Sequence, residues 1–504
     1  MATSTSQNER TYADAVTALN GLQTNFASLD AARKNPNMNL RSLPEMVEYF
    51  RRAGYKPSDF NKINILHVAG TKGKGSTCAF ITSILRQYSQ SPNTTATTPF
   101  PTKIGTYTSP HLKAVRERIQ IDGKPISETL FTKYFFELYD RLDAARKENA
   151  SPVEESGGSM PSYFRFLTML ALHVYVREGV DSAVLEVGVG GEYDSTNIVE
   201  RPTVTGITKL GIDHVLVLGE TLGKIAWHKA GIFKRGSKGF SVPQEDEGMK
   251  VIKARAEEKG VEFEEVEVLK AVEGIKLGLA GEFQKGNASL AVKMVEEHMK
   301  RCGVEITVGD GTVLPEEVKA GLEKAVWKGR CQIIEEDGVQ WCLDGAHTKE
   351  SIVEAGKWFA SVGERREYKD IVLLFNQQTR DAEQLARDLN EILKAQLGGD
   401  VFTHVYFTTN RTYSDHTYKP DLLSINVSSS AVDTLRVQKG LAKAWESTGS
   451  KAEVHVMETI QDTVKAIRAL EGKTQVLVTG SLHLVGGFLE VVEDGDDASA
   501  IIPN

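Results

Sequence analysis

The sequence predicts an α/β protein, with a P-loop-containing domain on a mostly parallel sheet followed by a second, Rossmann-like α/β domain. Apolar runs of strand length alternate with longer helical stretches, as in a parallel sheet covered on both faces. A glycine-rich loop at residues 68–77 separates one such run from a helical stretch. The alternation restarts after Gly329, and 504 residues exceed one ordinary core. We therefore expect two domains, at residues 1–327 and 328–504.

The first domain is expected to open with two helices before its sheet begins. Tyr12, Ala15, Val16 and Leu19 recur at helical spacing, and a second helix is expected to open at Leu43. Strands are expected at residues 63–69, 104–107, 182–187, 204–208 and 239–242. Further helices are expected at residues 75–88, 128–147, 163–178 and 285–301. Polar insertions rich in Ser, Thr, Pro and Gly, at residues 89–102 and 150–161, are typical of surface loops.

The second domain repeats the alternation as a doubly wound unit. Its strands are expected at residues 340–343, 371–375, 404–408, 453–456 and 475–479. Helical stretches such as 382–396 and 428–446 separate them, and the polar, acidic residues 493–504 are expected to fray.

Composition favours small-molecule partners. The net charge of -8 gives no electrostatic footprint for nucleic acid or an anionic membrane, and no apolar run reaches the length of a membrane span. Four cysteines without a C-x-x-C pair indicate free thiols in a reducing compartment. The N-terminus lacks an apolar h-region, so we expect a cytoplasmic protein. An upstream targeting extension, and with it a mitochondrial form, stays open.

The glycine-rich loop predicts ATP binding. A strand, a glycine loop and a helix together present backbone N–H groups and a lysine to phosphates. The spacing differs from G-x-x-x-x-G-K-[ST], because Gly75 follows Gly73 and Lys74 where that motif has the hydroxyl that holds Mg²⁺. The metal ligand must therefore come from elsewhere.

Three polar groups follow neighbouring strands and are the candidate metal ligands. Ser109, Glu186 and His214 each lie at or after the carboxyl end of an expected strand. Such ends meet at the edge where open α/β sheets bind ligands. A hydroxyl, a carboxylate and an imidazole can hold a divalent ion with room for phosphate oxygens.

Lys229 has two interpretations from its spacing alone. It lies on an expected helix that begins near Thr221. A surface lysine is the simpler interpretation. The alternative is a buried lysine with a lowered pKa, whose amine takes up CO₂ as a carbamate and acts as a carboxylate toward a metal.

The second domain also has polar groups after its strands. Asp344 and His347 follow one strand, Asn376 follows the next, and Ser481 follows the last. Arg330 lies at the expected junction, where a cation could reach phosphates bound on the first domain. A cleft lined by both domains would suit joining two substrates with ATP.

With these residues in place, the chain resembles the folylpolyglutamate synthase family, which is related to the Mur ligases of peptidoglycan precursors. The resemblance runs from about Tyr12 to Val491 and is strongest to the eukaryotic members. The motifs that carry it are GTKGKGST, TSPHL, SYFRFLT, EVGVGGEYDSTN, GIDH, IAWHKAGI, GRCQ, DGAHT and VTGSLHLVGG.

The resemblance implies ATP-dependent addition of L-glutamate to the γ-carboxyl of a folate's terminal glutamate. The carboxyl first takes the γ-phosphoryl group as an acyl phosphate, and the incoming amine then displaces phosphate. Implied partners are ATP, (tetrahydro)folate and L-glutamate, with Mg²⁺ and a monovalent cation such as K⁺ as cofactors. A monomer is expected.

The resemblance also assigns roles to individual positions. The implied catalytic residues are Lys74, Lys229, His347 and Asp344. The implied ATP-binding residues are Gly70, Thr71, Gly73, Lys74, Gly75, Ser76, Thr77, Asn287, Arg330 and Asp344. The implied metal ligands are Ser109, Glu186, His214 and, as a carbamate, Lys229. The implied folate- and glutamate-binding residues are Tyr163, Phe164, Arg165, His347, Asn376 and Ser481.

Two alternatives remain at this stage. A bifunctional dihydrofolate synthase/folylpolyglutamate synthase would join glutamate to dihydropteroate by the same chemistry. A P-loop phosphotransferase or ATPase would explain Lys74 and Glu186 but leaves the second domain without a role.

Overall fold

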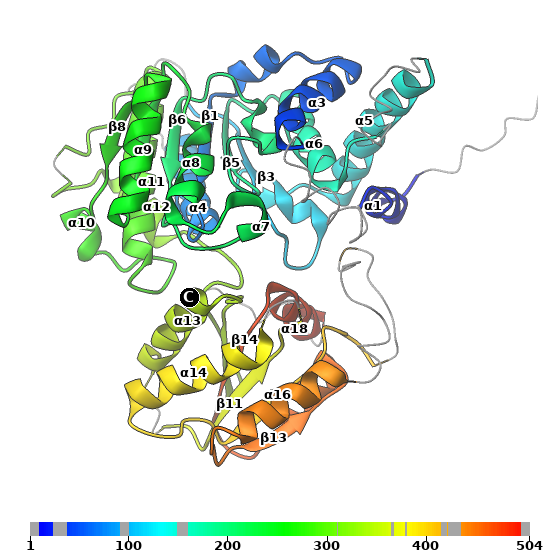
Figure 1. Ribbon diagram of the computed structural model, residues 1–504, viewed down its shortest axis with the longest axis vertical. Helices are drawn as coiled ribbons and strands as arrows, with labels where there is room; N and C mark the ends of the chain where they lie inside the picture. Colours follow the sequence, from blue (N-terminus) through cyan, green and yellow to red (C-terminus); the bar gives the residue numbers. More distant parts are fainter. Residues whose placement is uncertain are drawn as a thin grey trace, which may run out of the picture. The chain divides into compact units, whose positions relative to one another are not determined.

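The chain folds as two compact units, which we describe from a computed structural model (Figure 1). The structure describes residues 10–23, 38–90, 100–148, 160–309, 311–363, 367–378, 381–414, 421 and 435–494. The first unit comprises Met1–His111, Val115–Gly278 and Phe283–Val326, and the second comprises Leu112–Ala114, Leu279–Glu282 and Trp327–Asn504. The main division thus lies one residue from the boundary expected from the sequence, and two short segments of the N-terminal part belong to the second unit.

The first unit is built on an eight-stranded sheet in the order β4-β3-β2-β5-β1-β6-β7-β8. Its strands are β1 (Ile65–Ala69), β2 (Ile104–Tyr107), β3 (Ile119–Ile121), β4 (Lys124–Pro125), β5 (Ser182–Glu186), β6 (Val204–Ile207), β7 (Lys238–Ser241) and β8 (Glu262–Glu265). The strands from β2 to β8 in that order are parallel, whereas β3 and β4 pair antiparallel. Every residue of β1, β2, β5 and β6 is buried, as expected for a parallel sheet with both faces covered.

Helices cover both faces of this sheet. They are α1 (Tyr12–Asn20), α3 (Met38–Arg52), α4 (Lys74–Gln90), α5 (Glu128–Glu148), α6 (Tyr163–Glu178), α7 (Val215–Leu218), α8 (Leu222–Lys229), α9 (Asp246–Lys259), α10 (Lys270–Glu273), α11 (Gln284–Arg301) and α12 (Glu316–Glu323). One apolar core joins α1, α3, α5 and α6 to β2 and β5, and another joins α8 and α9 to β6. Between β1 and α4 lies the glycine loop, so the fold gives it a rigid strand on one side and a helix N-terminus on the other.

The second unit has a six-stranded sheet in the order β13-β12-β11-β14-β10-β9. Its strands are β9 (Gln332–Glu336), β10 (Val339–Leu343), β11 (Asp370–Phe375), β12 (His404–Phe407), β13 (Glu453–Val456) and β14 (Thr474–Thr479). Only β9 is antiparallel among them. The helices are α13 (Lys349–Ser361), α14 (Ala382–Leu397), α16 (Arg436–Glu446), α17 (Ile460–Arg468) and α18 (Leu482–Asp494). The first three share one core face of the sheet and the last two share the other.

The α/β class is confirmed, and the central strands agree with the expected ranges within two residues at each end. The expected start of the second helix at Leu43 is wrong, because α3 begins at Met38 and contains Pro44. Its buried side chains, Met46, Tyr49 and Phe50, outweigh the backbone hydrogen bond that proline cannot make. Most of the two polar insertions, residues 91–99 and 150–159, lies outside the described residues, as do residues 428–434 of the helix expected at residues 428–446.

The sequence missed the outer strands β3, β4, β8 and β9. These strands are short or polar, and β8 and β9 keep residues exposed along their length, so they lack the apolar runs that marked the central strands. All four cysteines are free, as expected. Among the described residues, no helix combines the length and hydropathy needed to cross a membrane.

Candidate active site

The glycine loop after β1 requires glycine at two positions. Gly70 has a φ of 144°, and a Cβ there would lie 1.8 Å from Thr208 Oγ1. Gly73 has a φ of 87°, and its Cβ would lie 2.3 Å from Asn287 Oδ1. Any side chain at either position would therefore clash as well as strain the backbone. The loop can lie this close to Thr208 and Asn287 only with glycine at both positions. It leads directly into the N-terminus of α4.

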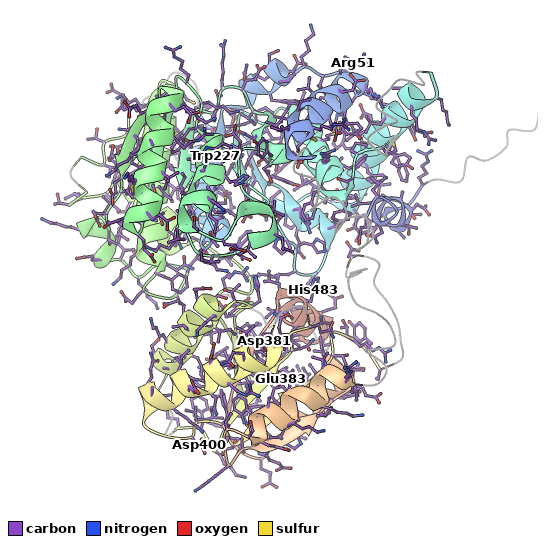
Figure 2. The ribbon with its side chains drawn as sticks, viewed as in Figure 1. Arg51, Trp227, Asp381, Glu383, Asp400 and His483 are labelled. Carbon is purple, nitrogen blue, oxygen red and sulfur yellow. The ribbon has the colours of Figure 1, made fainter. Side chains whose placement is uncertain are left out.

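Two lysine side chains from distant parts of the chain converge on this loop. Lys74 Nζ donates to Gly70 O at 3.0 Å, and Lys229 Nζ donates to the same oxygen at 2.7 Å. Lys229 lies at the end of α8, the helix on which Figure 2 labels Trp227, and is only 4% exposed. Burial, with the positive charge of Lys74 as a second cause, lowers the pKa of Lys229 well below that of a free lysine. The nearby carboxylates Asp213 and Asp194 oppose that shift of the pKa.

The glycine loop is also tied to the segment after β6. Backbone N–H groups of Thr71 and Lys72 both donate to Lys209 O at 3.0 Å, and Thr71 Oγ1 donates to Gly211 O at 3.1 Å. Lys72 forms an ion pair with Asp213 at 3.6 Å. The contacts hold the loop against the GIDH segment.

His214 ends the GIDH segment as an exposed residue in the left-handed region, with a φ of 52°. It is the N-cap residue of α7, and its N–H is held by Asp213 Oδ1 at 2.8 Å. The unusual backbone turns the chain at this point and leaves the imidazole accessible.

Glu186 is the buried carboxylate of the sheet edge. It ends β5, is 4% exposed, and accepts the N–H of Ser109 at 2.9 Å through Oε2. Because β2, β5, β1 and β6 are adjacent and parallel, the segments carrying Ser109, Glu186, the glycine loop and His214 leave the same edge of the sheet. The topology thus groups the three expected metal ligands along four consecutive strands.

The N-terminus of α11 packs against the loop through buried amides. Gln284 Nε2 donates to Ser76 Oγ at 3.2 Å, and Asn287 Nδ2 donates to Gln284 Oε1 at 2.9 Å. Gln284 is fully buried. Asn287 was expected at the ATP site from the sequence, but Gln284 was not, since nothing local links it to a serine 208 positions away.

A second supporting group stabilises the turn after β5. Asp194 accepts Val189 N at 2.9 Å through one oxygen, and both the N–H and the hydroxyl of Thr196 through the other. Gly191 lies against the backbone of α8, since its Cβ would come 2.6 Å from His228 O. These contacts fix α8, and with it Lys229, against the end of β5.

The segment expected to bind folate begins α6. Arg118 stacks over both aromatic rings, at 5.7 Å from the Tyr163 centroid and 5.3 Å from the Phe164 centroid. Phe164 is 53% exposed, and Arg118 Nε donates to His111 Nδ1 at 2.9 Å. Arg165 instead forms an ion pair with Glu45 of α3. The structure therefore groups Tyr163 and Phe164 with Arg118 and His111, which the sequence did not single out for this group.

In the second unit, Asp344 is the buried acid at a strand end. It follows β10 and accepts Cys331 N at 2.9 Å and Cys331 Sγ at 3.5 Å. Burial raises the pKa of Asp344, while Arg330 and the hydrogen bonds oppose the rise. Burial and the charge of Asp344 also raise the pKa of the Cys331 thiol, which keeps that thiol protonated.

Neutral amides and hydroxyls occupy the neighbouring strand ends. Asn376, fully buried after β11, bonds Asn410 Oδ1 at 2.7 Å and accepts Gln438 Nε2 at 3.0 Å. Ser481 Oγ accepts Leu484 N at 3.1 Å at the start of α18, where Figure 2 labels His483. The strands β11, β14 and β10 are adjacent, so Asn376, Ser481 and Asp344 leave the same edge of this sheet.

His347 is positioned by its own loop. Its Nδ1 lies 2.9 Å from Gly345 O. Because a carbonyl only accepts, Nδ1 donates in this hydrogen bond. The bond fixes the orientation of the imidazole ring within its loop.

Comparisons with known proteins agree with this architecture. A family model described as "Dihydrofolate synthetase, C-terminal domain" matches residues 329–491. Folylpolyglutamate synthase of Saccharomyces cerevisiae strain S288c is 46% identical over 491 residues, which cover 96% of this chain and 87% of the relative.

Solved structures share the fold at lower identity. Mycobacterium tuberculosis folylpolyglutamate synthase complexed with ADP has a TM-score of 0.69 at 23% identity, over 96% of this chain and 99% of that chain. An FPGS-AMPPCP-folate complex has a TM-score of 0.65 at 19% identity, over 96% of this chain and 100% of that chain. Because this chain is 46% identical to the yeast relative over 96% of its own residues, it belongs to the folylpolyglutamate synthase family.

Proposed function

We propose that this protein is an ATP-dependent ligase that adds L-glutamate to the γ-carboxyl of tetrahydrofolate mono- or polyglutamates and forms ADP. The convergence of Lys74 and Lys229 on Gly70 O supports the proposal most strongly. It places two lysine amines on a phosphate-type loop in a chain that is 46% identical to folylpolyglutamate synthase. The reaction needs that loop because a carboxylate becomes reactive toward an amine only after it receives a phosphoryl group.

The first unit handles the phosphates in this proposal. N–H groups of the loop and of the first turn of α4 face the phosphate oxygens, and Lys74 turns from Gly70 O toward them. Gln284 and Asn287 hold the loop in shape from α11. Positioning and neutralisation of charge supply most of the rate enhancement in phosphoryl transfer.

Ser109, Glu186 and His214 would hold Mg²⁺. The fit rests on Glu186, a buried carboxylate whose Oε2 is oriented by the Ser109 N–H at the edge where the three segments leave the sheet. Oxygen ligands are those that Mg²⁺ prefers. The ion, when bound, neutralises phosphate charge as the γ-phosphoryl group is transferred, and Glu186 and Ser109 orient it.

Lys229 would act as a carbamate. Its lowered pKa favours the neutral amine, and the amine adds to CO₂ to give R–NH–COO⁻ with release of one proton. Burial excludes water from the product, and the carboxylate-like group would complete the set of metal ligands.

The second unit would bind the incoming glutamate and part of ATP. His347, oriented by its hydrogen bond to Gly345 O, would take a proton from the attacking amine. Asn376 and Ser481 offer neutral polar groups to the amino acid, and Arg330 with Asp344 would contact ATP. Tyr163 and Phe164, in the first unit, offer aromatic surface to the flat pterin ring. A monovalent cation such as K⁺ would serve as a further cofactor.

A second candidate function is the bifunctional enzyme that also joins glutamate to dihydropteroate. The description of the matching family model, dihydrofolate synthetase, favours including it. The chemistry is the same and only the acceptor differs.

One assay separates these functions. Purified protein is incubated with ATP, Mg²⁺ and labelled L-glutamate, with tetrahydrofolate or dihydropteroate as acceptor. Labelled polyglutamates and ADP with tetrahydrofolate alone support the proposal, and labelling with both acceptors supports the bifunctional enzyme. ADP formation without incorporation by folded protein would contradict both and point to an ATPase.

We further propose a cytoplasmic monomer, with a mitochondrial form from an extended start. The four free cysteines support a reducing compartment, and the net charge of -8 supports small-molecule partners rather than nucleic acid.

A further inference from the structure

Two histidines and a glutamate meet at the outer strands of the second sheet, away from the residues considered so far. His404 is the first residue of β12, and Glu453 is the first residue of β13, the edge strand. The parallel register pairs His404 with Glu453 and Tyr406 with His455. Since residues two apart share a face of a strand, all four side chains lie on one face of the sheet.

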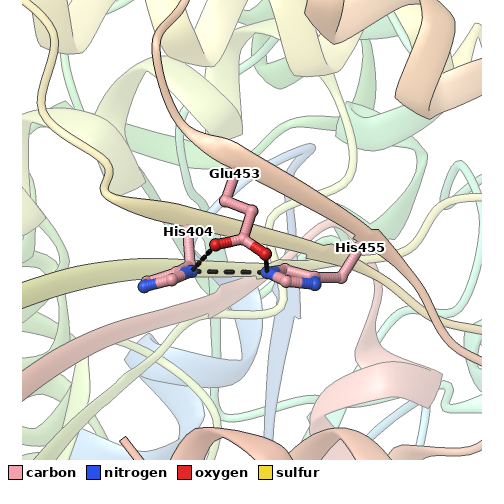
Figure 3. Close-up of side chains that lie close together, drawn as sticks. All are labelled: His404, Glu453 and His455. Atoms are coloured by element: carbon pink, nitrogen blue, oxygen red, sulfur yellow. Dashed lines mark hydrogen bonds and ion pairs between the residues drawn. The ribbon is translucent and has the colours of Figure 1, made fainter. Parts of the chain in front are cut away.

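The potential ligand atoms of this cluster lie close together (Figure 3). His404 Nδ1 lies 3.3 Å from His455 Nε2 and 3.6 Å from Glu453 Oε2. His455 Nε2 lies 3.7 Å from the other carboxylate oxygen, Glu453 Oε1. One ligand atom of each residue lies within 4.8 Å of the others. A zinc ion with bonds of about 2.0–2.1 Å in tetrahedral geometry places its ligand atoms roughly 3.4 Å apart. The separation of the two nitrogens, 3.3 Å, is close to that value, and each nitrogen lies 3.6 or 3.7 Å from one of the two carboxylate oxygens.

Neighbouring groups orient both rings. The Tyr406 ring stacks on His455 with centroids 4.3 Å apart and planes at 14°. Asp370, the first residue of β11, lies 3.7 Å from the other nitrogen of His404, Nε2. A carboxylate behind a ligating histidine is the usual arrangement at metal sites, where it fixes the ring and raises its basicity. The two rings are 18% and 26% exposed, so an ion could enter from solvent.

From this geometry we propose that His404, Glu453 and His455 form a binding site for a divalent transition metal ion of the zinc class. Imidazole nitrogens and one carboxylate suit zinc better than magnesium, which prefers oxygen ligands. The cluster lies at the amino ends of β12 and β13, whereas Asp344, Asn376 and Ser481 follow the carboxyl ends of their strands. The metal therefore joins the edge strand to its neighbour and takes no part in the ligase reaction.

The test is Zn²⁺ binding to the untagged, full-length protein by equilibrium dialysis and calorimetry. Wild type should bind one more Zn²⁺ than H404A/H455A, which removes the two nitrogen ligands and leaves any binding at the catalytic residues or cysteines unchanged. Equal stoichiometry and affinity in the two proteins would overturn the proposal. Co²⁺ in place of Zn²⁺ should give the visible absorption of a tetrahedral nitrogen and oxygen site in wild type only.

A matched pair of acid-to-amide variants keeps the test independent of folding. Glu453→Gln should weaken Zn²⁺ binding by about tenfold or more, because it replaces a ligand at a 68% exposed position. Glu471→Gln, at a 93% exposed position of the same unit, should leave the affinity unchanged. Equal effects of the two variants, or displacement of Zn²⁺ by equimolar Mg²⁺, would refute the site.

Discussion

The carboxyl ends of the central strands carry different chemistry in the two units. In the first unit they bring together buried ionisable groups, with Glu186 at the end of β5 and Lys229 held against the loop after β1. In the second they carry neutral groups, Asn376 and Ser481, and an acid, Asp344, whose pKa is raised by burial. Two sheets with similar topology therefore differ at this edge. We call the edge of the first sheet that carries Glu186 and Lys229 the charged edge, and the part of the second that carries the Asn376 amide and the Ser481 hydroxyl the neutral edge.

The difference indicates how the two halves of the reaction are divided. Buried charges are costly unless groups of opposite charge or hydrogen bonds compensate them. In the proposed function, phosphates and a divalent metal would bind at the charged edge of the first unit. In the second, amides that already bond each other form a rigid polar surface, which can orient an amino acid without adding net charge.

The largest expected effect concerns the charged edge. Lys229→Ala should lower kcat by about a hundredfold to a thousandfold, because it removes a preorganised group beside the transferring phosphoryl group. Bicarbonate should not restore the activity. Lys224→Ala, an exposed lysine on the same helix, is the control and should keep normal turnover. Steady-state kinetics with ATP and tetrahydrofolate provide the measurement. Near-normal turnover of Lys229→Ala would remove the carbamate from the mechanism.

A smaller effect is expected at the neutral edge. Asn376→Ala should raise the KM for glutamate roughly tenfold, as expected when one hydrogen bond to a substrate is lost in a buried site. Since the change does not touch the glycine loop, the KM for ATP should stay within about twofold of wild type. The measurement is initial velocity against glutamate concentration.

Asn390→Ala provides a matched control for that experiment. Asn390 is also buried in the second unit, where its amide bonds Thr448 Oγ1 at 3.0 Å. Its loss should destabilise the unit to a similar degree and leave the KM for glutamate unchanged. Equal shifts of KM in the two variants would mean that Asn376 acts only through folding.

The smallest effect is on stability and has a defined pH dependence. The pKa of Lys229 is lowered in the folded state, so folding disfavours its charged form. Lys229→Met should raise the free energy of unfolding by about 1 kcal/mol at pH 7, since Gly70 O keeps its bond from Lys74.

The sign of that pH dependence follows from linkage. The wild-type protein gains stability from Lys229 as pH rises from the lowered pKa of the folded state toward the ordinary lysine pKa of 10.5. The advantage of Lys229→Met should therefore shrink between pH 7 and pH 9.5. Urea unfolding in buffers free of bicarbonate measures it. An advantage that grows with pH would show that the lysine is stabilised in its charged form.

The sequence predicted those features that local pattern determines. Central strands such as β5 and β11 were located because continuous apolar runs mark them, and Ser109 and Glu186 were selected because they lie at or just after the ends of such strands. The outer strand β8 was missed because its residues are mostly charged.

Contacts between distant residues could not be predicted in this way. The bond from Lys229 to Gly70 joins residues 159 positions apart, and spacing alone left that lysine on the surface. The same holds for the contact between Gln284 and Ser76, 208 positions apart. The stacking of Arg118 over Tyr163 and Phe164 likewise depends on how the residue just before β3 packs against the start of α6.

The central claim is that the charged edge activates a carboxylate by phosphorylation before glutamate reacts. It is tested most directly with a tetrahydrofolate substrate whose γ-carboxyl carries oxygen-18 in both positions. If an acyl phosphate forms, the amine attacks the carbonyl carbon, the acyl C–O bond breaks, and one labelled oxygen leaves with phosphate. Mass spectrometry of the inorganic phosphate should then show one oxygen-18 for each glutamate added. Phosphate without label, formed while glutamate is incorporated, would contradict the account.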